Sequence, residues 1–89
     1  MTGKRISAEQ VKVMAVFTTE PHGWFDSNAI QRKAEVSSSS ATHFLLALLK
    51  FGVLERLEVF PGYLYRLSPK AEAQPYFHRV QEAAAAMKP

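Results

Sequence analysis

The chain has 89 residues, of which 47% are hydrophobic and 21% charged, and its formal net charge is +3. This composition is typical of a folded globular protein and excludes a disordered chain, and the length suits one modest core, so we expect a single domain over residues 1–89. The sequence contains no cysteine, which excludes disulfide bonds and thiolate metal ligands. No apolar run reaches the roughly 18 residues of a membrane-spanning helix, and the first residues lack the apolar core of a signal peptide, so we expect a cytoplasmic protein.

The first predicted helix covers residues 6–19. Ser7 is a suitable cap, and Gln10 stands three positions later, where it can complete a capping box. The helix ends before Pro21, and Trp24-Phe25 follow. Two interpretations of this pair remain open: it forms a short strand beside a later hairpin, or Trp24 is a hydrophobic plug of the core.

Two short helices joined by a serine-rich turn come next. The first covers residues 26–35, with Asp26 or Ser27 as its cap. The second covers residues 38–51, and Gly52 ends it because glycine readily takes the left-handed conformation after a last turn. Apolar residues at helical spacing form the buried stripe of this second helix, which consists of Ala41, Phe44, Leu45, Leu48 and Leu49.

Residues 53–67 contain two runs rich in β-branched, aromatic and leucine side chains, separated by Pro61-Gly62. This pattern predicts a β-hairpin. Because Pro-Gly suits a type II turn rather than the mirror-image turns of two-residue hairpins, we expect a slightly longer loop.

The last predicted helix covers residues 69–88 and begins at Ser68-Pro69, since proline is accepted in a first helical turn. Pro75 lacks a backbone donor, so the helix is either kinked or split near residue 75. Beyond Pro75 one face is apolar, and it either packs on the core of its own chain or pairs with the same helix of a second copy.

Helix, turn, helix and hairpin in this order resemble the winged helix-turn-helix domains of small bacterial, archaeal and phage regulators, of the MarR-like or PadR-like type. Three stretches carry the resemblance over nearly the whole chain: the turn Ala34 to Ala41, the exit Leu45 to Arg56, and the segment Tyr65 to Lys70. The resemblance implies an α+β, mainly α fold with a three-helix core, a hairpin wing and a C-terminal amphipathic helix. It also implies a nucleoid-associated, DNA-binding transcription regulator, such as a repressor, that acts by occupying its site.

In that fold the helix over 38–51 enters the major groove of duplex DNA. No carboxylate occurs between Glu35 and Glu55, so this helix can approach phosphates without repulsion. The residues expected to contact DNA are Ser38, Ser39, Ser40, Thr42, His43 and Lys50 on this helix, Arg32 and Lys33 on the preceding helix, and Lys4 and Arg5 in an N-terminal arm. The resemblance further implies a homodimer, whose interface would consist of Tyr76, Phe77, Val80, Ala84 and Met87.

A second hypothesis is a protein-interaction module. The helix over 38–51 has no Arg, Asn or Gln for bidentate base contacts, and the hairpin tip has no Arg or Lys for the minor groove. Leu46 also lies on the outward side of this helix. It either touches a thymine methyl group or, with Phe60 and Tyr63, belongs to a protein interface.

We expect neither an enzyme nor a resident cofactor or metal. His22, His43 and His78 are dispersed, and no carboxylate pair is placed for acid–base chemistry. The serine run from Ser37 to Ser40 fits a turn and helix cap better than a nucleophile.

Overall fold

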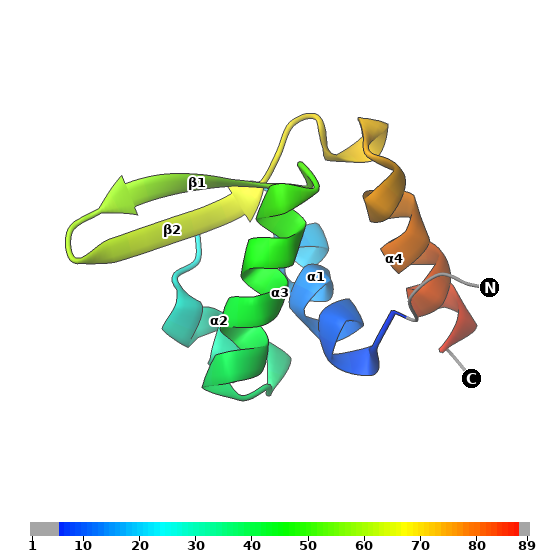
Figure 1. The fold of residues 1–89 in the computed structure, drawn as a ribbon, viewed down its shortest axis with the longest axis horizontal. Helices are drawn as coiled ribbons and strands as arrows, with labels where there is room; N and C mark the ends of the chain where they lie inside the picture. The colour runs from blue at the N-terminus through cyan, green and yellow to red at the C-terminus, as the bar shows by residue number, and fades with distance from the viewer. Residues whose placement is uncertain (1–5, 88–89) are drawn as a thin grey trace.

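A computed structural model of the chain describes residues 6–87 (Figure 1). Its elements, in chain order, are α1 (Ala8–Thr19), α2 (Ser27–Ala34), α3 (Ser38–Lys50), β1 (Leu54–Val59), β2 (Gly62–Leu67), the 3-10 turn η1 (Ala71–Ala73) and α4 (Pro75–Ala86). This is the mainly helical α+β fold that the sequence predicts. The hairpin projects from one side of the bundle formed by α1, α2 and α3, and α4 lies on the opposite side (Figure 1).

Each helix of the bundle begins at a short polar side chain. The cap oxygens of Ser7, Asp26 and Ser37 accept the backbone N–H groups of Gln10, Ala29 and Ser40 at 3.2, 2.8 and 3.2 Å. These bonds satisfy donors that a first helical turn leaves without a partner. The Gln10 amide does not serve the expected capping box, because it is buried and donates to the Tyr76 phenol of α4.

The core lies where the three helices of the bundle meet. Phe17, Ile30, Leu45 and Leu48 are fully buried there, and the rings of Phe17 and Phe25 meet edge-on with centroids 5.7 Å apart. Burial of each such side chain contributes about 1.5–3 kcal/mol to folding. The apolar periodicity of α3 therefore marks its core side, although only part of the predicted stripe is fully covered.

The turns after α2 and α3 use left-handed backbone. α2 ends at Ala34, one residue before the predicted end, because Glu35 has φ 57° and ψ 49°. Gly52 has φ 77°, as its position after α3 predicts. A Cβ atom at Gly52 would lie 3.0 Å from the Gln74 side chain, so this position also requires a small residue.

The two strands of the hairpin pair antiparallel from Leu54 opposite Leu67 to Val59 opposite Gly62. The connection is a two-residue loop, Phe60-Pro61, with a cis peptide bond between its residues. The expectation of a longer loop centred on Pro61-Gly62 is therefore wrong, because Gly62 already belongs to β2. Phe25 forms a bridge with Tyr65 on the other side of β2, so the predicted short strand at Trp24-Phe25 is reduced to one paired residue.

The C-terminal segment is split rather than kinked. Ser68-Pro69 is not helical, η1 follows at Ala71–Ala73, and α4 starts with Pro75 at its first position. α4 packs back on α1, where Phe77 and Val80 are 7% and 1% exposed. This packing explains the apolar face of the helix without a second chain.

Candidate nucleic-acid interface

The exposed face of α3 is the surface on which half of the predicted DNA contacts lie. Ser38, Ser39, Thr42, His43 and Lys50 are all exposed, and Ala41, Leu45 and Leu48 on the opposite side are buried. Ser39, His43 and Lys50 follow one row of the helix at i, i+4 and i+11. The structure thus brings hydroxyl, imidazole and ammonium groups together on one side of α3, as the sequence predicts.

Leu46 belongs to the same row. Its side chain is 48% exposed and lines a groove between α3 and α4 with a volume of about 540 Å³, together with His43, Lys50, Phe51, Tyr76 and Arg79. The rings of Phe51 and Tyr76 stack there with centroids 4.4 Å apart. Leu46 is therefore a groove residue of α3, and no residue of the hairpin tip lines this groove.

Tyr76 is a half-buried residue of this groove. Desolvation by burial raises the pKa of its phenol above the usual value, and the nearby positive charge of Arg79 opposes part of that rise. The guanidinium of Arg79 lies 5.8 Å from the centre of the Tyr76 ring. Arg79 thus adds a cation beside α3 that the sequence pattern, which places it on the polar side of α4, does not indicate.

Ser40 lies apart from the exposed row. Its hydroxyl is half-buried and donates to the Glu9 carboxylate of α1 at 3.3 Å. The structure therefore places a carboxylate beside the first turn of α3, although the sequence of α3 itself has none. Glu9 is a residue of the interface region that sequence reasoning missed, because the two positions are 31 residues apart.

The two cations of α2 have different surroundings. Arg32 is exposed on the side of α2 opposite Ile30 and Ala34. Lys33 instead points toward the end of α1, where its ammonium lies 3.9 Å from the Glu20 carboxylate and 5.6 Å from the centre of the Phe25 ring. Arg32 keeps its place as a candidate phosphate contact, whereas Lys33 already has an anionic partner.

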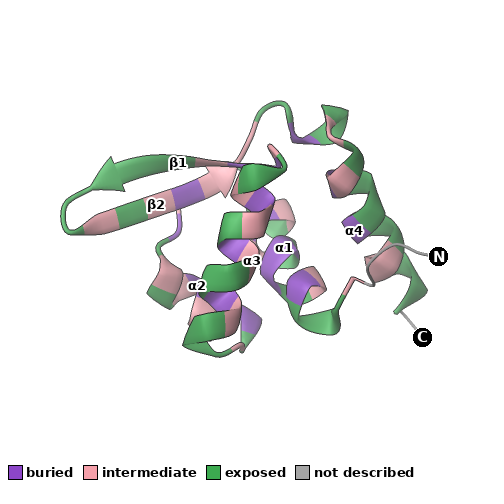
Figure 2. Cartoon of the chain, in the orientation of Figure 1, coloured by how far each residue is buried: buried purple, intermediate pink, exposed green. Residues whose placement is uncertain are grey.

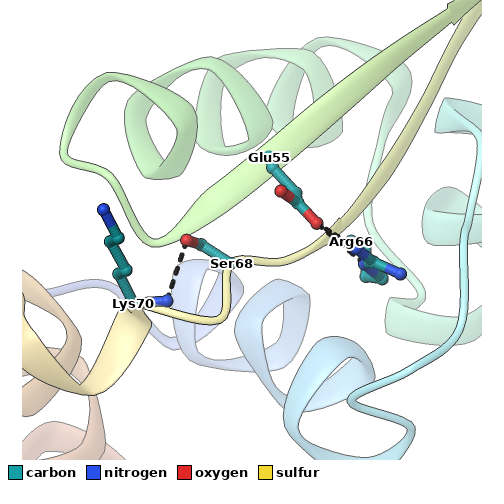
Figure 3. A network of polar contacts seen from close by, with 4 residues as sticks. All are labelled: Glu55, Arg66, Ser68 and Lys70. Carbon is teal, nitrogen blue, oxygen red and sulfur yellow. Dashed lines mark hydrogen bonds and ion pairs between the residues drawn. The ribbon is translucent and has the colours of Figure 1, made fainter.

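The two arginines of the hairpin, Arg56 and Arg66, lie on opposite faces of it, and each contacts an aromatic ring. Arg66 pairs with Glu55 on the neighbouring strand (Figure 3) and stacks over Trp24, with its guanidinium carbon 4.4 Å from the ring centre. Arg56 lies 4.1 Å from the centre of the Tyr63 ring. Trp24 is half-buried and therefore serves as a platform for Arg66 rather than as a core plug.

The predicted dimer residues divide between the inside and the surface of the chain. Phe77 and Val80 lie in the core, Tyr76 and Ala84 are half-buried, and Met87 is 46% exposed. Phe77 and Val80 are thus not available to a second copy. The N-terminal arm, Lys4 and Arg5, lies outside the described residues.

Residues 6–87 contain no group of His, Cys, Asp and Glu side chains that could hold a metal ion. None of their helices is long and apolar enough to span a membrane.

The three-helix bundle, the exposed α3 and the hairpin that follows it define a winged helix-turn-helix fold, as the sequence predicts. Solved structures share it. A possible transcriptional regulator from Methanosarcina mazei superposes with a TM-score of 0.67 at 20% identity, over 91% of this chain and 72% of that one. The PcaV transcriptional regulator from Streptomyces coelicolor, solved with its natural ligand, gives a TM-score of 0.70 at 18% identity, over 98% and 61%.

A MarR family protein from Bacillus stearothermophilus gives a TM-score of 0.63 at 18% identity, over 93% of this chain and 56% of that one. The chain thus spans less than two thirds of the PcaV and Bacillus proteins. No protein-family profile matches the sequence, and no curated protein sequence matches it. At these identities the likeness establishes the fold.

Proposed function

We propose that the protein is a DNA-binding transcription regulator that places α3 in the major groove of duplex DNA. The observation that carries this proposal is the exposed face of α3, which presents hydroxyls, an imidazole and an ammonium and no carboxylate of its own. The descriptions of three similar structures, as two transcriptional regulators and a MarR family protein, support the proposal. The protein would regulate by occupying its site.

The roles of the residues follow from their chemistry. Ser39, Thr42 and His43 can reach base edges or phosphates through short side chains near the start of α3. Lys50 at the end of α3 and Arg32 on α2 carry charge suited to phosphates. Because no Arg, Asn or Gln lies on α3, we expect affinity to depend strongly on phosphates and base discrimination to be modest.

Fluorescence anisotropy with a labelled random duplex tests the proposal directly. We expect binding at about 50 mM salt that weakens steeply by about 200 mM, because released counterions drive the association. A folded protein that does not bind duplex DNA at the lower salt would overturn the proposal.

Point variants assign the binding to α3. Lys50→Ala should weaken binding and reduce the salt slope by about one unit, whereas Lys12→Ala, which removes the same charge from α1, should change neither by much. On a selected site, His43→Ala should cost more than it does on random DNA. Equal losses for Lys50→Ala and Lys12→Ala would show that binding follows net charge and not α3.

A second candidate function, a protein-interaction module, is favoured by one observation. Phe60 at the hairpin tip is 99% exposed, and Val59 and Tyr63 beside it are 38% and 40% exposed. Large apolar side chains gathered at a projecting tip are typical of protein contacts. The anisotropy experiment separates the two functions, because a folded protein without DNA affinity would leave the hairpin tip as the candidate binding surface.

A further inference from the structure

β1 is an edge strand. The sheet of the described residues has the order β1-β2, and the only further pairing, Phe25 with Tyr65, is on the far side of β2. Arg56, Leu57, Glu58 and Val59 are all exposed, and β1 is open to solvent along most of its length (Figure 2). An open edge of this kind is able to pair with another strand.

The backbone groups that point outward from β1 can be identified. Tyr65 exchanges both of its backbone hydrogen bonds with Phe25, at 2.9 and 2.8 Å, so its N–H and C=O point away from β1. Arg56 stands opposite Tyr65, and partners in an antiparallel ladder alternate between bonded and non-bonded pairs. The N–H and C=O of Arg56 therefore point to the open edge. Because the direction alternates along a strand, those of Glu58 also point there, and those of Leu57 and Val59 point to β2.

The charges of β1 select one register for pairing with an identical strand. Two copies related by a two-fold axis pair antiparallel, with one residue opposite itself. Axes at Glu55, Arg56 or Glu58 would bring like charges face to face. An axis at Leu54 or Val59 would overlap only the strand ends.

An axis at Leu57 satisfies the backbone and the charges together. It places Arg56 of each copy opposite Glu58 of the other, and these are the residues whose N–H and C=O groups face the open edge. Each Arg56–Glu58 pair can then exchange two backbone hydrogen bonds and combine opposite charges.

The leucines on one face of the hairpin also favour the register with Leu57 on the axis. Leu57 pairs with Leu64 within the hairpin and is 48% exposed. With the axis at Leu57, the two Leu57 side chains meet as a non-hydrogen-bonded pair, the arrangement with the closer side chains. Leu64 of each copy flanks this pair, so a row of four leucines crosses the joined sheet, and the contact between the two Leu57 side chains removes part of their surface from water.

We propose that the open edge of β1 binds the β1 edge of a second copy of this chain, with Leu57 on the two-fold axis, and forms a continuous four-stranded sheet. The proposal does not depend on DNA binding. It also differs from a dimer through α4, whose Phe77 and Val80 are buried in the core. Because one short strand per copy buries little surface, the dimer is weak and forms at high protein concentration.

Sedimentation velocity over a range of protein concentrations tests the proposal, with charge variants at the exposed residues Arg56 and Glu58 whose folding is checked by circular dichroism. Arg56→Glu alone and Glu58→Arg alone place like charges opposite each other in the selected register, and each should raise the dimer Kd about tenfold. An equimolar mixture of the two variants restores both opposite-charge pairs and should form a heterodimer. Lys70→Glu, an exposed residue outside the hairpin with the same charge change as Arg56→Glu, is the matched control.

Amide hydrogen exchange of the natural protein gives an independent reading of the register. The N–H groups of Arg56 and Glu58 should gain protection as the concentration rises, and those of Leu57 and Val59 should not change because they already face β2. A protein that stays monomeric at every concentration would overturn the proposal. So would a dimer that Arg56→Glu leaves unchanged, or a mixture of the two charge variants that does not associate.

Discussion

At the scale of single residues, Glu35 adopts a backbone conformation that is unfavourable for a residue with a side chain. It is the C-cap of α2 and has φ 57°, in the left-handed region that favours glycine. A residue with a Cβ atom loses about 1–2 kcal/mol there. Its carboxylate also lies at the negative end of the α2 dipole. The sequence predicts a helix through residue 35 because no glycine marks this end.

Glu35→Gly should therefore stabilise the protein. We expect a gain of about 0.5–1 kcal/mol in the free energy of unfolding, since the relief of strain exceeds the added flexibility of the unfolded chain. Urea denaturation followed by circular dichroism measures the change. Glu35→Ala is the control, because it removes the carboxylate and keeps the Cβ atom. If both variants gain equally, charge rather than backbone strain is the cause.

At the scale of elements, the local features of the helices could be predicted and their packing partners could not. Ser37 and Gly52 mark the ends of α3 through short-range chemistry, which a sequence shows directly. The apolar face of α4 is equally visible, but periodicity does not say what covers it. The structure resolves this for Phe77 and Val80, which pack inside the chain.

The contact between α1 and α4 leads to a prediction for Tyr76. The Gln10 amide is 4% exposed and donates to the Tyr76 hydroxyl, so Tyr76→Phe leaves a buried donor without this acceptor. We expect a loss of about 1–3 kcal/mol in the free energy of unfolding, measured by urea denaturation at neutral pH. Tyr63→Phe, on the exposed hairpin tip, is the matched control and should cost little.

The pH dependence of stability gives a second measure of the same contact. The pKa of Tyr76 is raised in the folded state, so its contribution is fully present below the ordinary tyrosine pKa. Above the ordinary tyrosine pKa, the Tyr76 phenol ionises in the unfolded chain before it ionises in the folded protein. The contribution of Tyr76 to stability is therefore lost as the pH rises through the folded-state pKa. Tyr76→Phe should therefore lose less stability in alkaline solution than the natural protein. If Tyr76→Phe and the natural protein lost the same amount of stability at alkaline pH, the prediction would be contradicted.

At the scale of the whole molecule, folding brings carboxylates from distant parts of the sequence to residues of the candidate interface. Lys33 meets Glu20, and Ser40 meets Glu9, so the candidate interface is less uniformly basic than the sequence of α3 and its neighbours indicates. The exposed face of α3 was predictable because helical spacing determines it. These neighbours were not, because they depend on how α1 packs against α2 and α3.

Glu9 has a testable consequence if α3 binds DNA. Its carboxylate lies beside the first turn of α3 and should repel phosphates there, so Glu9→Gln should tighten duplex binding about two- to fivefold at low salt. The gain should shrink as salt screens the charge. Glu82→Gln, which removes the same charge from the exposed side of α4, is the matched control in the anisotropy titration. Equal gains for the two variants would mean that net charge alone governs affinity, whereas a gain confined to Glu9→Gln would place the DNA at the first turn of α3.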